Sequence, residues 1–126
     1  MGILKSNKKR VLIVDDDPLI LEVTSEFLQN EGFETATAGN AGAAIEEMKK
    51  EPAHVILLDI KLPDQNGLEF LGKLKAQYPE VPVVMLTGSG YDEDMMQKAL
   101  QNGASGYVSK ETDLENMVVA VKRLLK

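Results

Sequence analysis

Short apolar runs that recur between segments of helical periodicity are the feature that most constrains how this chain can fold. Four of the runs are apolar and rich in Val and Ile, the last of them more weakly, which is typical of parallel strands buried on both faces. A fifth run alternates with small polar residues and suits an outer strand. In chain order, the predicted strands cover residues 11–14, 33–38, 55–58, 81–86 and 105–108.

Apolar residues spaced at i, i+3, i+4 and i+7 between the strands predict amphipathic helices. Asn66 is placed to cap the third helix, and Asn102-Gly103 to end the fourth, which is expected over residues 91–101. The apolar stripes of the other helices are Ile20, Val23 and Phe27; Ala41, Ala44, Ile45 and Met48; Leu68, Leu71 and Leu74; and Leu114, Met117, Val118, Val121 and Leu125.

The fivefold alternation of strand and helix predicts an α/β fold. Short connections between such elements imply right-handed crossovers and a doubly wound, five-stranded parallel sheet with helices on both faces. Ligands of these folds bind beyond the carboxyl ends of the strands. The residues that follow each strand are therefore the first candidates for a functional site.

Length and composition narrow the class of protein. A chain of 126 residues suits one domain, and the lack of cysteine excludes disulfides, a thiolate metal site and a thiol nucleophile. A formal charge of −6 argues against a nucleic-acid surface. No signal peptide and no run of about 18 apolar residues is seen, so we expect a cytoplasmic location. We expect residues 1–9 to form a flexible basic arm and residues 10–126 the folded domain.

Carboxylates follow two of the predicted strands. Asp15, Asp16 and Asp17 come directly after the first strand, and Asp59 ends the third. Acids in loops are often solvated turn formers, but the apolar run before Asp59 delivers it at the end of a central strand. Clustered carboxylates repel one another and require a proton or a cation. Because only oxygen ligands are available, we expect Mg²⁺, with Mn²⁺ as an alternative.

A hydroxyl and an ammonium follow two further strands. Thr87 ends the fourth strand, and Lys110 follows the fifth. Taken singly, a Thr there is more often a turn residue and a Lys is more often solvent-exposed. Together with the acids at the ends of strands one and three, these groups are suited to hold phosphate oxygens.

Four motifs, taken in order, resemble the receiver domain of two-component response regulators over essentially the whole chain. They are VLIVDDDP at 11–18, LLDIKLPDQNG at 57–67, MLTG at 85–88 and GASGYVSK at 103–110. The resemblance implies the flavodoxin-like strand order 2-1-3-4-5.

The resemblance also implies a phosphoacceptor chemistry. Asp59 would take a phosphoryl group from a histidine kinase or a histidine phosphotransfer protein. Asp15, Asp16 and Asp59 would hold Mg²⁺ together with the backbone carbonyl of Lys61, and Lys110 would pair with the phosphoryl oxygens. The chain would then be a self-phosphorylating switch with slow autodephosphorylation and not a turnover enzyme.

The switch residues implied by the resemblance are Thr87, which moves toward the phosphoryl group, and Tyr107, whose rotamer follows it, while Gly88 leaves room beside Thr87. The change would be read on the face of the fourth helix, fifth strand and fifth helix, where Tyr91, Met95 and Met96 lie. Met pairs on helices are nonetheless more often core residues than partner surface. The expected reader is a downstream protein or an output domain absent from this sequence, with the chain a monomer or a weak phosphorylation-dependent dimer.

Several residues depart from the family pattern or have weaker roles. Glu111 stands where many receivers carry a cis proline, and a cis bond before Glu costs about 3 to 4 kcal/mol, so we expect trans. Lys61 and Ser89 occupy positions that tune hydrolysis of the acyl phosphate. Asp17 and Asp64 are expected to cap turns or helices and not to bind metal. His54, the only histidine, is expected to be structural or at the surface.

Three other classes of protein fit the sequence less well. A haloacid-dehalogenase-like phosphatase needs a second Asp where Lys61 stands. In a flavodoxin-like cofactor binder, Asp15 to Asp17 would repel the phosphate of the cofactor. A P-loop protein is excluded because the sequence has no P-loop motif. The strongest alternative is a receiver fold used as an interaction module without phosphorylation. Both a stand-alone receiver ending at Lys126 and the receiver piece of a longer regulator fit the sequence.

Overall fold

Five parallel strands form one sheet in the order β2-β1-β3-β4-β5. The computed structural model describes residues 8–88, 92–110 and 114–125. The order and the parallel pairing confirm the expected doubly wound sheet, and β2 lies at an edge as its alternating pattern predicted. The strands are β1 (Arg10–Val14), β2 (Glu34–Ala38), β3 (Val55–Asp59), β4 (Val83–Thr87) and β5 (Gly106–Ser109).

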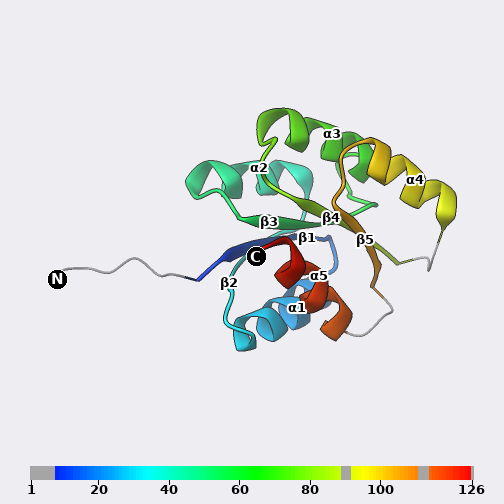
Figure 1. Cartoon of the computed structure of the whole chain (residues 1–126). Helices are drawn as coiled ribbons and strands as arrows, with labels where there is room; N and C mark the ends of the chain where they lie inside the picture. The colour runs from blue at the N-terminus through cyan, green and yellow to red at the C-terminus, as the bar shows by residue number, and fades with distance from the viewer. Residues whose placement is uncertain (1–7, 89–91, 111–113, 126) are drawn as a thin grey trace.

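Helices cover both faces of the sheet (Figure 1). On one face lie α1 (Pro18–Asn30) and α5 (Leu114–Leu124), and on the other lie α2 (Ala41–Lys50), α3 (Gly67–Gln77) and α4 (Glu93–Gln101). The helices pack apolar side chains against the sheet, so there is one hydrophobic layer on each side. For α1 the predicted stripe was partly wrong: Leu28 is buried with Leu21 and Phe27 packed beside it, whereas Val23 is exposed to solvent.

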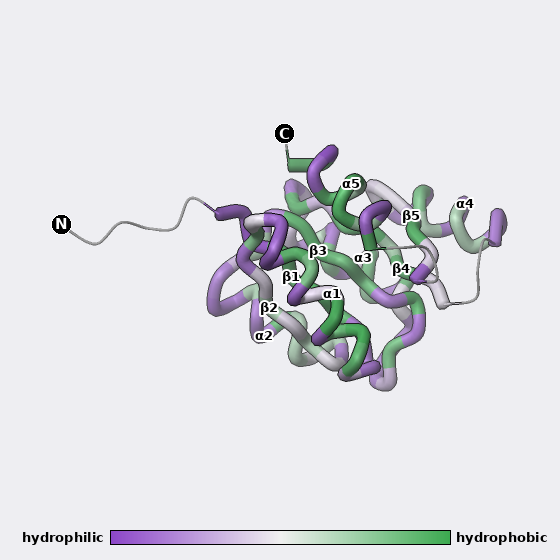
Figure 2. Tube along the Cα trace, turned by 90° about the horizontal axis from the view of Figure 1, so that it is seen from below, coloured by the Kyte–Doolittle hydropathy of each residue, from purple (hydrophilic) through white to green (hydrophobic). Residues whose placement is uncertain are grey.

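The central strand β3 supplies both layers because its side chains alternate between the two faces. Ile56 and Leu58 belong to the cluster under α2, α3 and α4, whereas Val55 and Leu57 belong to the cluster under α1 and α5. All four side chains are fully buried. Figure 2 shows the resulting hydrophobic colour along the central strands. The burial of β3 fixes where Asp59, its last residue, emerges.

Two predicted boundaries were wrong by two residues. The fourth strand begins at Val83 and not at residue 81, since the Val81 amide donates to the Tyr78 carbonyl in the turn after α3 (3.1 Å). The fourth helix begins at Glu93 because the Asp92 side chain caps it by accepting from the Met95 amide (3.2 Å). Tyr91 lies outside the described residues.

Both predicted helix-end signals are confirmed. The Asn66 side chain accepts the Leu68 amide (2.8 Å) and so caps α3. Asn102 is the C-cap of α4, and Gly103 follows it with φ +101, a conformation that favours glycine.

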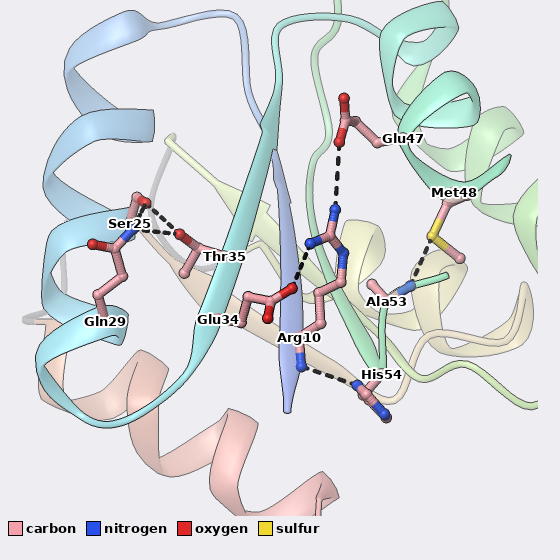
Figure 3. A network of polar contacts seen from close by, with 9 residues as sticks. All are labelled: Arg10, Ser25, Gln29, Glu34, Thr35, Glu47, Met48, Ala53 and His54. Carbon is pink, nitrogen blue, oxygen red and sulfur yellow. Dashed lines mark hydrogen bonds and ion pairs between the residues drawn. The ribbon is translucent and has the colours of Figure 1, made fainter. Parts of the chain in front are cut away.

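A polar network joins the amino-terminal ends of β1, β2 and β3 (Figure 3). The Arg10 guanidinium pairs with Glu34 of β2 (2.7 Å) and with Glu47 of α2 (3.5 Å). The backbone amide of Arg10 donates to Nδ1 of His54 (2.9 Å), which places His54 in a structural role, as expected. This network holds β1, β2, α2 and the start of β3 together.

Within the described ranges, none of the helices has the length and apolar character needed to cross a bilayer.

The loop between β3 and α3 closes tightly at Gly67. The Gly67 amide donates to the Ile60 carbonyl (2.7 Å), and Lys61 and Asn66 form an antiparallel bridge. A Cβ at Gly67 would lie 2.4 Å from the Asp59 carbonyl oxygen and 2.5 Å from that of Ile60. Only a residue without a side chain fits between the end of β3 and the start of α3.

We predict that Gly67→Ala lowers the free energy of unfolding by about 3 kcal/mol or more, since its Cβ would meet backbone that cannot move without shifting β3. The matched control is Gly72→Ala in the same helix, where a Cβ meets nothing within 4 Å. Its helix propensity should make the control more stable by about 0.5–1 kcal/mol. Urea unfolding of both variants tests this, and equal stability of the two would contradict the steric argument.

Candidate functional site

Three carboxylates meet at the carboxyl edge of the sheet. Asp15 follows β1 and Asp59 ends β3, and because these strands are neighbours their ends lie side by side. Asp15 is fully buried and Asp59 nearly so, whereas Asp16 is exposed. Each of the three offers a carboxylate oxygen within 4.8 Å of the others.

Lys110 reaches into this cluster from the end of β5. Its Nζ lies 2.6 Å from Oδ2 of Asp15 and 3.0 Å from Oδ2 of Asp59. The backbone amide of Lys110 donates to the Thr87 carbonyl (2.7 Å), which fixes where the side chain starts. The ammonium thus bridges the two buried carboxylates.

Burial and the neighbouring charges shift the pKa values of Asp59 and Lys110. Burial raises the pKa of Asp59, and the nearby Asp15 raises it further, while the hydrogen bond and charge of Lys110 act in the opposite direction without cancelling the rise. For Lys110, burial lowers the pKa, but the hydrogen bonds to Asp15 and Asp59 outweigh it and raise the pKa overall. Lys110 therefore stays charged, whereas the ionised form of Asp59 is disfavoured.

The donor set fits a hard divalent cation. When Asp15, Asp16 and Asp59 are all ionised, the single ammonium of Lys110 leaves two negative charges unbalanced. The available ligand atoms are oxygens, which Mg²⁺ prefers, and an exposed carboxylate such as that of Asp16 gives access from solvent. A bound divalent ion would relieve the repulsion that raises the pKa of Asp59.

A pocket of about 400 Å³ opens above the cluster. It gathers most of the residues that the sequence singled out, among them the nearly buried Thr87. The lining residues are Asp16, Asp59, Ile60, Lys61, Thr87, Gly88, Asp92, Met95, Tyr107 and Lys110.

Tyr107 of β5 lines this pocket with a buried hydroxyl. That hydroxyl has no hydrogen-bond partner among the residues that the structure describes. Burying a phenol hydroxyl without a hydrogen-bond partner costs free energy, so the packing around Tyr107 and not a hydrogen bond sets this orientation. Met95 packs against the core beside it, in line with its expected role as a core residue.

Two acids near the cluster act as caps, as expected. The Asp17 side chain accepts the Leu19 amide at the start of α1 (2.9 Å). Asp64, in the loop after β3, accepts the amides of Ala41 and Gly42 at the start of α2, both at 3.0 Å. These two hydrogen bonds lower the pKa of Asp64.

One polar pocket residue was missed by the sequence reasoning. Asp92 lines the pocket and caps α4, and its place three residues before Met95 is an N-cap signal that could have revealed it. The expectations for Ser89 and Glu111 lie outside the described residues.

Comparison with known sequences identifies close relatives. A sequence profile of the response regulator receiver domain matches residues 11–122. The probable transcriptional regulatory protein TcrX of Mycobacterium tuberculosis is 37% identical over 116 residues, which are 92% of this chain and 49% of TcrX. The chain therefore spans about half the length of this relative.

Comparison with solved structures gives the same result. A CheY-like receiver domain protein from Methanospirillum hungatei JF-1 is 35% identical with a TM-score of 0.87, and the match covers 94% of each chain. The BeF₃-activated receiver domain of DrrB is 33% identical with a TM-score of 0.85, covering 94% of this chain and 97% of that one.

We predict that Asp59→Asn raises the melting temperature of the metal-free protein at pH 7 by a few degrees. The raised pKa means that folding disfavours the ionised carboxyl, so the gain is complete above the folded-state pKa of Asp59. It should shrink as the pH falls and vanish below 3.8, the ordinary pKa of an aspartate, where the wild-type carboxyl is protonated in both the folded and the unfolded protein.

Thermal unfolding in EDTA across this pH range is the measurement. Asp17→Asn, which keeps a capping oxygen on an exposed loop, is the control and should change little. A variant less stable than wild type at pH 7 would mean that the lost contact with Lys110 outweighs the relief of burial and repulsion.

Proposed function

The chain belongs to the response regulator receiver domain family, and from this premise we propose that Asp59 is the carboxylate that accepts the phosphoryl group. Receivers of two-component systems take phosphoryl groups from histidine kinases, so the chain is part of a signalling switch. One observation carries the assignment to Asp59: it is a nearly buried carboxylate at a strand end that faces an open pocket and contacts a lysine.

The proposed reaction is an in-line displacement at phosphorus. A carboxylate oxygen of Asp59 forms the new O–P bond as the N–P bond to a donor phosphohistidine breaks, and the electron pair of that bond leaves on the imidazole. Lys110 holds an ammonium 3.0 Å from Asp59, where it can pair with the oxygens of the transferred group. Because Lys110 stays protonated, its charge is available throughout.

The proposed metal ligands are Asp15, Asp16, Asp59 and the backbone carbonyl of Lys61. What supports them is the clustering of three carboxylates, of whose negative charges Lys110 balances only one, and the place of Lys61 in the pocket wall. Bound Mg²⁺ would neutralise charge on the phosphoryl oxygens. The fixed strand ends of β1 and β3 hold Asp15 and Asp59 ready without large rearrangement.

The proposed switch involves Thr87 and Tyr107. A phosphoryl group adds about −1.5 to −2 charge and several strong acceptors to the pocket, which favours movement of the Thr87 hydroxyl toward it. Tyr107 sits in the same pocket wall with an unsatisfied hydroxyl, so its position is open to change. The proposed readout is the surface of α4, β5 and α5.

The finer assignments are proposals of the same kind. We infer that the protein is cytoplasmic, that it switches between two states and that it does not turn over a substrate. We also infer that it is a monomer or a weak dimer and that it acts on a downstream protein or on a linked output domain. TcrX, a probable transcriptional regulator about twice as long, is consistent with a linked output domain. The remaining alternative is an interaction module that works without phosphorylation, in which case Asp59→Asn would leave partner binding unchanged.

We predict that incubation with acetyl phosphate and Mg²⁺ adds one phosphoryl mass to the wild type, and that the gain is lost in EDTA and in Asp59→Asn. The reason is that the displacement needs both the Asp59 oxygen and charge neutralisation in the pocket. Intact-mass spectrometry measures the gain directly.

The matched control is Asp17→Asn, which removes one charge from the same acidic run but belongs to the α1 cap. It should label like the wild type. An unlabelled wild type, beside a control receiver that labels, would contradict the proposed function and favour the interaction module.

A further inference from the structure

The carboxylate of Asp64 joins two loops that lie far apart in the sequence. Its Oδ1 accepts the Ala41 amide and its Oδ2 accepts the Gly42 amide, both at 3.0 Å. These are the first two amides of α2, whose orphan N–H groups are natural partners for an anion. Asp64 itself belongs to the loop between β3 and α3.

That loop carries Lys61, the proposed source of a backbone metal ligand. At its base, Lys61 bridges to Asn66 and the Gly67 amide donates to the Ile60 carbonyl. Residues 62–65 form the tip beyond this base. Leu62 packs against the core from the tip, and the Asp64 carboxylate fastens the tip to α2.

The start of α2 is in turn tied to the loop after β1. The Asp15 amide donates to the Ala38 carbonyl at the end of β2 (3.0 Å), three residues before α2 begins. Asp64 thus links the loop that carries Lys61 to the strand end that holds Asp15. The three loops at this corner of the sheet are connected through hydrogen bonds.

We propose that Asp64 is a positioning residue for the metal site, because it holds the loop after β3 against α2 and so fixes the backbone at Lys61. The inference rests on the proposed function, since it concerns the affinity of the same site for Mg²⁺. Asp64 does not bind the ion; it reduces the freedom of the loop that presents a ligand. Outer contacts of this kind tune metal affinity through the ligands that they orient.

A purely local role in capping α2 is the competing explanation, and the chain offers a matched control for it. Asn40 also caps α2, accepting the Ala43 amide with its side chain (2.7 Å), but it comes from the segment directly before the helix. Asn40→Ala therefore removes a cap from the same helix and leaves the tie between the two loops in place. Asp64→Ala removes a cap and the tie together.

The test measures the Kd for Mg²⁺ by titration of amide chemical shifts in wild type, Asp64→Ala and Asn40→Ala, with urea unfolding of each. Both variants should lose comparable stability. The Kd should rise about three- to tenfold in Asp64→Ala, at or just below the lower end of the roughly 10- to 100-fold range of outer-contact effects. It should stay within about twofold in Asn40→Ala, which loses only a cap. Asp64→Asn keeps one acceptor oxygen, is safer for folding, and should fall between.

A second readout uses the reciprocity of coupling. If Mg²⁺ and the Asp64 contact favour the same loop position, then saturating Mg²⁺ should slow hydrogen exchange at the Ala41 and Gly42 amides in the wild type. The same addition should have little effect on those amides in Asp64→Ala.

Each remaining outcome has a defined meaning. Equal Kd values in wild type and both Asp64 variants would overturn this inference and leave the proposed function intact. An equal rise in Asn40→Ala would also overturn it, because helix stability alone would then set the affinity. A wild type that binds no Mg²⁺ would overturn the proposed function together with this inference.

Discussion

The ion pairs of Lys110 with Asp15 and Asp59 are the interaction on which the site depends. Two carboxylates buried side by side would repel each other strongly in a medium of low dielectric. One ammonium between them offsets part of that repulsion, but burial, which is the larger cause, and the remaining repulsion from Asp15 together leave the pKa of Asp59 raised. The pocket therefore holds more negative than positive charge, and a divalent cation or a proton would balance the excess.

The geometry that permits this contact comes from the sheet. Hydrogen bonds link the end of each strand to a neighbour: Asp15 to Ala38, Ile60 to Leu86, and Lys110 to Thr87. Because the parallel pairing fixes the ends of the strands, it also fixes where the acids, the hydroxyl and the ammonium of the site begin.

The sequence predicted the fold and the convergence of the site because both follow from simple patterns. Buried apolar runs predict parallel strands, and three of those strands end at or just before Asp15, Asp59 and Lys110. The failures have local physical causes: Val81 is held in a turn, and Asp92 caps α4, so the helix begins at Glu93 and not earlier. The partner of Asp64 could not be foreseen, since capping rules describe nearby residues and Ala41 lies 23 positions away. The orientation of Tyr107 likewise depends on packing that no residue pattern encodes.

The central claim is that Asp59, among three carboxylates within 4.8 Å of one another, is the one that carries the phosphoryl group. The most direct test is to phosphorylate the wild-type chain, reduce the acyl phosphate with borohydride, and locate the resulting homoserine by tandem mass spectrometry. The account predicts homoserine at position 59 alone, because only the Asp59 carboxylate combines a lining position in the pocket with contact to Lys110. Homoserine at position 15 or 16, or none in a protein that gained the phosphoryl mass, would contradict it.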